Sequence, residues 1–344
     1  MSDRRGRRRR VLLAAGVLAA TALGFGVSPG AASAAPAASA ARSAPAPSGS
    51  TALAGHIMQV AADDTMVRLL FRASGLGADQ SLDPASVRVD LDATTVPAHA
   101  TVVGTAPGKQ VARTAMLVLD VSGSMRGAGI AGARQAATAF LDAVPADVKV
   151  GLVTVSTTAT VAVPPTTNRS VMRNRVAGLQ AIGNTALYDG TLLALHQLGS
   201  DGSRTIVLLT DGHDEGSRTT IGQLVTAIRA ANGVSVDAVS FGTAAAQVAP
   251  LQQLTSAAGG RILATNEADD FAAAFGQAAH DIATELLVTV NVPKAFAGRA
   301  VNVTVTALAG GTRIGDTVFS DLPAPPTPTV APTPAGPRPV SPNP

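Results

Sequence analysis

Residues 115–124 have the sequence AMLVLDVSGS. The first five are apolar and predict a buried β-strand, because strands covered on both faces form nearly continuous apolar runs. Asp120, Ser122 and Ser124 follow where the chain turns, so one carboxylate and two hydroxyls point the same way. Hard oxygen donors of this kind suit a divalent cation such as Mg²⁺, which takes few protein ligands and keeps several waters. In isolation the same residue types are also ordinary in turns and helix caps.

Two later segments carry further oxygen donors. Residues 206–212 have the sequence IVLLTDG, a second apolar run that ends in Asp211 and a turn glycine. Between the two runs, residues 183–189 have the sequence GNTALYD, which places Thr185 just before a helix-like segment. In order and in context, the three pieces resemble the metal-ion-dependent adhesion site of von Willebrand factor type A (VWA) domains, written DxSxS…T…D.

This resemblance covers about residues 113–287, roughly half of the chain. One position departs from the family pattern, because members usually have glycine just before the threonine and this chain has Asn184. Asparagine tolerates a left-handed backbone better than most residues. The resemblance implies a bound Mg²⁺, with Mn²⁺ or Ca²⁺ as the other candidate ions.

The resemblance also implies a role for each donor. The hydroxyls of Ser122 and Ser124 would ligate the ion directly, and Thr185 would ligate it directly or through water. Asp120 and Asp211 would act mainly through bridging waters and supply negative charge. Because few of the direct ligands are charged, the ion stays electrophilic, and a carboxylate from a partner protein could complete its shell.

The central part of the chain alternates between strand-like and helix-like segments. Further strands are expected near 148–155, 159–163, 205–210, 234–241 and 261–264. This alternation predicts an α/β fold, a doubly wound and mainly parallel six-stranded sheet with helices on both faces, of the VWA or Rossmann-like kind. With the strand order 3-2-1-4-5-6, the order reverses between strands 1 and 4, where ligands bind at the carboxyl ends. Those two strands end at Asp120 and Asp211.

The segments on either side of this domain are rich in strand-like patterns. We expect a β-rich flank at 52–112, the VWA domain at 113–284 and a second β-rich flank at 285–321. Alternation such as that of Val301-Asn302-Val303-Thr304 supports strands in the flanks. We infer that the two flanks pair into one small β-sandwich; two separate extensions are the alternative.

Both ends of the chain have distinctive compositions. Residues 1–34 combine an arginine-rich start, an apolar stretch and small residues, which is typical of a cleaved signal peptide. An uncleaved membrane anchor is the alternative, and both the general and the twin-arginine export routes stay open. Residues 35–51 are expected to form an Ala/Pro/Ser linker, and residues 322–344 a disordered Pro-rich tail.

Charge and cysteine content narrow the function. Six of the 26 basic and one of the 23 acidic residues lie in 1–34, so the remaining chain has 20 basic and 22 acidic residues. A net charge of −2 gives no support for nucleic-acid binding. The chain has no cysteine, so an exported form is stabilised by its core, by metal or by partners rather than by disulfides.

Other chemistries lack a key residue. An aspartyl phosphotransferase needs a second acid two positions after the nucleophile, where this chain has Ser122. A serine hydrolase needs glycine on both sides of its Gly-x-Ser-x-Gly serine, which neither Ser122 nor Ser124 has. A literal G-x-G-x-x-G occurs at Gly127, Gly129 and Gly132, but it begins after the strand-to-helix turn that a dinucleotide site uses. The five histidines show no zinc spacing.

We therefore expect an exported, divalent-cation-dependent protein-binding module that acts in adhesion or assembly without catalysis. Its partner would be an extracellular or cell-surface protein that contributes an acidic side chain to the metal. The alternatives are a component of a secretion or pilus assembly system, a metal-dependent hydrolase for which no general base is evident, and a turn-capped α/β domain that binds no metal.

Overall fold

The fold is that of a computed structural model. It describes residues 53–324 except for Asp64, Ala78, residues 106–110, His213 and residues 243–244; the side chains at 59, 62, 63 and 245–247 are also left out. The expected signal peptide (1–34), the linker (35–51) and residues 325–344 of the expected tail lie outside the described residues.

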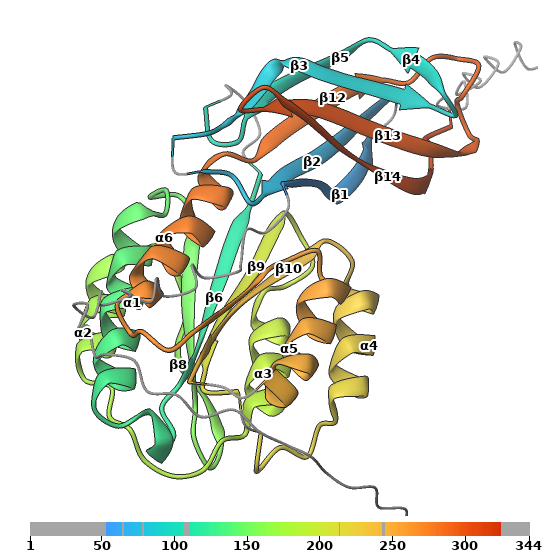
Figure 1. The fold of residues 1–344 in the computed structure, drawn as a ribbon. Coiled ribbons are helices and arrows are strands. Elements are labelled where there is room, and N and C mark those ends of the chain that lie inside the picture. The colour runs from blue at the N-terminus through green and yellow to red at the C-terminus, as the bar shows by residue number, and fades with distance from the viewer. Residues whose placement is uncertain are drawn as a thin grey trace, which may run out of the picture. The chain divides into compact units, whose positions relative to one another are not determined.

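The centre of the fold is a six-stranded sheet with the order β11-β10-β9-β6-β7-β8 (Figure 1). Neighbouring strands are parallel except for β8, which runs antiparallel to β7. The strands are β6 (Arg113–Asp120), β7 (Lys149–Val155), β8 (Ala159–Thr166), β9 (Ser203–Thr210), β10 (Val234–Phe241) and β11 (Ile262–Thr265). The expected fold class is confirmed, and the order reverses between β6 and β9 as expected.

Helices cover both faces of this sheet. One core contains residues of α1 (Ala128–Ala143), α2 (Arg169–Ala177) and α6 (Asp270–Ala283). The other contains residues of α3 (Leu187–Gln197), α4 (Ile221–Ala231) and α5 (Ala245–Ala257).

Strand β6 shows why both faces must be covered. Its side chains alternate between the two cores, with Leu117 and Leu119 in one and Met116 and Val118 in the other. All four residues are completely buried. This explains why the strand has an unbroken apolar sequence rather than a half-polar one.

The two flanks form a β-sandwich of two four-stranded sheets. Their orders are β1-β2-β12-β5 and β14-β13-β3-β4. The strands are β1 (Ala54–Asp63), β2 (Met66–Ser74), β3 (Leu82–Leu91), β4 (Thr94–Val96), β5 (Ala98–Val102), β12 (Leu286–Asn291), β13 (Ala300–Ala309) and β14 (Thr312–Asp321). Each sheet mixes strands from both flanks, since β12 lies between β2 and β5 and β13 pairs with β3. The domain boundaries drawn from the sequence stay predictions.

Buried polar contacts join the sandwich to the central domain. Glu285, which is completely buried, forms an ion pair with Arg72 of β2 at 3.0 Å. Its Oε1 also accepts a hydrogen bond from the Ser203 hydroxyl of β9 at 2.7 Å, and Arg72 donates to the Thr205 hydroxyl at 2.8 Å. Burial raises the pKa of Glu285, whereas the charge of Arg72 lowers it. In the described part of the chain, no helix has both the length and the apolar character needed to cross a membrane.

Candidate metal centre

Asp120 is the last residue of β6 and is completely buried. Its Oδ1 accepts a hydrogen bond from the backbone N–H of Ser122 at 2.8 Å, and its Oδ2 accepts one from the Thr210 hydroxyl at 2.9 Å. Thr210 is the last residue of β9. Contacts from its own turn and from the neighbouring strand therefore fix the orientation of the carboxylate.

The surroundings of Asp120 disfavour its charge. Its pKa is raised to about 6, mainly by burial and to a smaller extent by the charge of Asp211, whereas the hydrogen bonds from Ser122 and Thr210 act to lower it. A cation close to both carboxylates would favour their ionised forms and so reverse this effect. The buried Asp120 and the partly buried Asp211 thus fit a bound cation.

The loop after β6 presents the two serine hydroxyls. Ser122 is buried and Ser124 is exposed, and their Oγ atoms are 2.9 Å apart. The backbone N–H of Val121 donates to the carbonyl of Val155 at 2.8 Å, and that of Gly123 donates to the carbonyl of Gly183 at 2.8 Å. The serine loop is thereby attached to the end of β7 and to the loop that carries Thr185.

The threonine loop depends on a glycine for its path. Gly183 has a φ of +82°, and a Cβ there would lie 2.5 Å from Thr157 Oγ1 and 2.7 Å from Ser156 Oγ. The left-handed residue of this loop is Gly183 rather than Asn184. The departure from the family pattern at Asn184 therefore requires no unusual backbone.

Thr185 connects the loop to the segment after β9. It is 3% exposed, and its carbonyl accepts hydrogen bonds from the N–H groups of Glu215 and Gly216 at 2.9 and 3.1 Å. Asp211 lies at the start of that segment, directly after β9. Hydrogen bonds thus hold together the three loops that the sequence motif names.

The three loops surround one hollow of about 330 Å³. Its lining includes Ser122, Ser124, Thr185 and Asp211, four of the five residues expected from the sequence. The fifth, Asp120, does not line the hollow, but it accepts hydrogen bonds from the N–H of Ser122, which does line it, and from the Thr210 hydroxyl. The remaining lining residues are Gly183, Asn184, Glu215 and Gly242.

The donor set fits a hard divalent cation. It consists of two carboxylates and three hydroxyls, all oxygen, which is the ligand chemistry of Mg²⁺. Across the described ranges, no group of three or more His, Cys, Asp or Glu side chains gathers in a metal-binding arrangement. Any ion in the hollow would accordingly depend on Ser122, Ser124 and Thr185 as well as on the two acids.

Two acids near the hollow, Asp189 and Asp214, accept hydrogen bonds from backbone N–H groups of neighbouring loops. Asp189 accepts hydrogen bonds from the N–H groups of Arg218 and Thr219, and Asp214 accepts one from the N–H of Tyr188. These carboxylates brace the loops. Sequence reasoning missed the contact of Thr210 with Asp120, although its position just before Asp211 at a strand end was the available signal. His213 lies outside the described residues.

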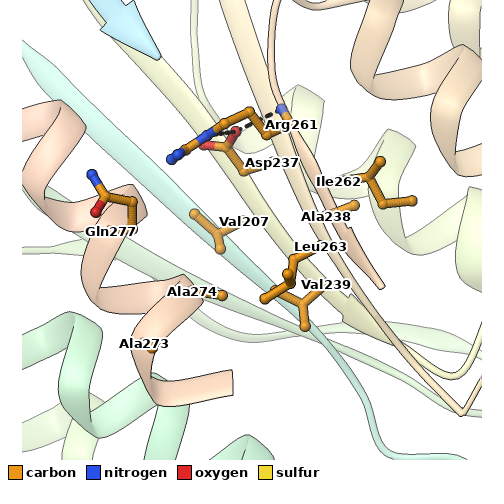
Figure 2. A pocket seen from close by; sticks show the side chains of 10 residues that line it. All are labelled: Val207, Asp237, Ala238, Val239, Arg261, Ile262, Leu263, Ala273, Ala274 and Gln277. Atoms are coloured by element: carbon orange, nitrogen blue, oxygen red, sulfur yellow. Dashed lines mark hydrogen bonds and ion pairs between the residues drawn. The ribbon is translucent and has the colours of Figure 1, made fainter. Parts of the chain in front are cut away.

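A second hollow of about 250 Å³ lies among β9, β10, β11 and α6 and is separate in its lining from the first (Figure 2). Most of its lining is apolar, for example Val207, Val239 and Leu263. Its polar part includes Arg261 and Asp237, which Figure 2 shows side by side, with the N–H of Arg261 donating to Asp237 Oδ1 at 2.9 Å. This hollow lacks the hydroxyls of the first.

Comparison with known proteins agrees with this architecture. Residues 115–213 match the family model of the von Willebrand factor type A domain. The chain therefore contains a VWA domain, and all five expected site residues fall within the matched segment.

The chain is also similar to individual proteins. A UPF0353 protein from Mycolicibacterium paratuberculosis is 35% identical over 37% of this chain and 44% of its own length. The chain thus spans less than half the length of such curated relatives. Among solved structures, a von Willebrand factor type A protein from Catenulispora acidiphila is 14% identical, with a TM-score of 0.47 over 79% of this chain and 73% of that one. BatB from Bacteroides thetaiotaomicron is 17% identical, with a TM-score of 0.42 over 50% and 98%.

Proposed function

We propose that this protein is a divalent-cation-dependent protein-binding module. The observation that carries the proposal is the single hollow in which three loops place Ser122, Ser124, Thr185 and Asp211 together, with Asp120 bonded beneath them. Oxygen donors of this kind, gathered at the switch point of a parallel sheet, are suited to hold Mg²⁺.

The neutral and the charged residues would have different roles in holding the ion. The hydroxyls of Ser122, Ser124 and Thr185 would hold the ion as neutral donors, while Asp120 and Asp211 would supply negative charge from nearby. When bound, the ion supplies an electrophilic centre that accepts a carboxylate oxygen from a partner. The chain's own residues would position that centre through the loops that line the hollow.

The partner in this proposal is an extracellular or cell-surface protein with an acidic side chain at the contact. Export is supported by the arginine-rich, apolar and small-residue pattern of residues 1–34. The VWA domain supports a role in protein interaction rather than catalysis.

Titration of Mg²⁺ and Mn²⁺ into the purified chain, followed by calorimetry, tests the proposal. The wild-type chain should bind one ion, and Asp120→Ala should abolish binding because it removes the buried negative charge beneath the hydroxyls. Ser124→Ala is the second variant, since Ser124 is exposed and its loss threatens the fold least.

Asp142→Ala serves as the control, because Asp142 is an exposed acid that pairs with Arg173 on the surface. It should leave ion binding unchanged. If Asp120→Ala and Ser124→Ala both fold and both retain the wild-type affinity, the hollow is not a metal centre.

A further inference from the structure

One exposed apolar side chain stands beside the candidate metal centre. In the described part of the chain, the large apolar residues with substantial exposure are Val171, Ile182 and Phe319. Ile182 is 65% exposed and directly precedes Gly183, which lines the hollow. Single exposed apolar residues are common on protein surfaces, so the position of Ile182 gains meaning only from its surroundings.

The backbone of Ile182 is held on both sides. Its N–H donates to the carbonyl of Val121 at 2.7 Å, and its carbonyl accepts a hydrogen bond from the Ser156 hydroxyl at 2.6 Å. The next residue is fixed as well, because the carbonyl of Gly183 accepts from the N–H of Gly123 at 2.8 Å. Ile182 is therefore exposed on a fixed backbone, and such preorganisation reduces the entropy lost when a partner binds.

Arg126 lies close to Ile182 in the same surface region beside the hollow. Its Nε donates to the carbonyl of Ala181 at 3.4 Å, and its Nη2 would lie 4.0 Å from a Cβ at Gly123. The surface beside the hollow thus presents an exposed arginine, a residue type enriched at protein interfaces, next to an exposed apolar side chain. The positive charge complements an acidic partner segment.

Building on the proposed function, we infer that Ile182 is the specificity contact of this surface. The partner segment places an acidic side chain at the metal and an apolar side chain against Ile182. Ile182 directly precedes Gly183, which lines the hollow, and residues in an extended segment advance by about 3.3 Å each. The apolar residue should therefore lie one or two positions from the acid. The metal alone would accept any accessible carboxylate, so this second contact selects among acidic partners.

Random short peptides displayed on phage provide the probe. The full chain is immobilised in millimolar Mg²⁺, and bound phage are eluted with EDTA. The wild-type chain should enrich peptides with Asp or Glu and an aliphatic or aromatic residue one or two positions away. Ile182→Ser should still enrich acidic peptides and should lose the apolar preference.

Affinity gives the second readout. A labelled synthetic peptide from the wild-type selection should bind Ile182→Ser about tenfold more weakly, because the variant forfeits the burial of one large apolar side chain. Mg²⁺ affinity measured by calorimetry should stay unchanged, since Ile182 donates no side-chain oxygen.

Val171→Ser is the matched control. Val171 is 46% exposed on α2, and Arg169 at the start of that helix donates to the carbonyls of Pro145 and Val148. Those residues precede β7, whereas Asp120 lies opposite the last residue of β7. The control is therefore at the other end of the sheet and should change peptide affinity by less than about twofold.

The outcomes separate this inference from the proposed function. If no phage depend on the metal, both fail. If EDTA releases acidic peptides that lack an apolar neighbour, or if Ile182→Ser keeps the same preference, only the role of Ile182 is overturned.

Discussion

At the scale of single residues, the orientation of the Asp120 carboxylate depends on another strand, because its Oδ2 accepts a hydrogen bond from the Thr210 hydroxyl of β9. Asp120 and Asp211 can be recognised because each follows an apolar run. The contact between Asp120 and Thr210 depends on the register of β6 against β9, in which Leu119 is opposite Leu209. Register between distant strands is set by packing across the whole sheet and cannot be read from either strand alone.

Thr210→Val tests the importance of that support. Valine keeps the shape but removes the hydroxyl that donates to Asp120 at 2.9 Å and accepts from the N–H of Gly212 at 2.9 Å. The Mg²⁺ affinity should fall about tenfold or more, in the range known for residues that orient metal ligands. Calorimetric titration measures the change.

Thr226→Val is the control for this substitution. The Thr226 hydroxyl donates to the carbonyl of Gly222 on an exposed part of α4, and Thr226 is not among the residues that line the hollow. An equal loss of affinity in the two variants would mean that Thr210 acts through general stability rather than through Asp120.

At the scale of elements, the loop before α3 holds the most constrained backbone of the site. Gly183→Ala should lower the free energy of unfolding by about 1–3 kcal/mol and sharply weaken Mg²⁺ binding. The reason is that a Cβ at this left-handed position would lie 2.5 Å from Thr157 Oγ1. Urea unfolding and ion titration measure the two effects.

Gly178→Ala offers the comparison. Gly178 follows α2 with a φ of −87°, and a Cβ there would meet its nearest neighbour at 3.7 Å. This variant should retain wild-type stability and ion binding. If Gly183→Ala has the same stability and ion affinity as Gly178→Ala, the loop is not held in the conformation described.

Helix α6 carries a buried acid, Asp281, whose pKa is raised in the folded protein. Asp281 is 2% exposed and pairs with Arg261, and Gln277 donates to its Oδ1 at 3.0 Å. Burial raises its pKa to about 6, although the charge of Arg261 lowers it and that of Asp237 raises it. The folded state therefore holds a proton more tightly than the unfolded state does.

The sign of the resulting stability change follows from this raised pKa. Between the ordinary pKa of about 4 and the raised value of about 6, the contribution of Asp281 to stability should be lost as the pH rises, by up to about 1.4 kcal/mol per pH unit. Asp281→Asn should flatten this part of the curve when urea unfolding is measured across the range. An unchanged difference between variant and wild type at all pH values would contradict the assignment.

At the scale of the whole molecule, the two flanks form one sandwich although the VWA domain separates them in sequence. Alternating apolar residues such as Val301, Val303 and Val305 made strands predictable. The sequence did not predict which strands pair, because the position of β12 between β2 and β5 depends on side-chain packing in the core of the sandwich. Long-range pairing of this kind is specified by the complete core rather than by local sequence.

The buried pair of Arg72 and Glu285 couples this sandwich to β9. Glu285→Gln should lower the free energy of unfolding by about 3–5 kcal/mol, because it leaves the Arg72 charge buried without its counter-charge. The double variant Arg72→Met with Glu285→Met should cost much less than the two single variants together, since it removes both charges at once. Urea unfolding of the wild type, Arg72→Met, Glu285→Met and the double variant gives the coupling energy.

The exposed pair of Arg173 and Asp142 is the reference within the same chain. Its N–O distance is 2.5 Å, shorter than the 3.0 Å of the buried pair, but its side chains are 45% and 58% exposed. Asp142→Asn should cost less than about 1 kcal/mol, because water screens both charges before and after the substitution. If Glu285→Gln proves as mild as Asp142→Asn, water reaches Arg72 in the folded protein, and the link between the sandwich and the VWA domain is looser than the buried contacts indicate.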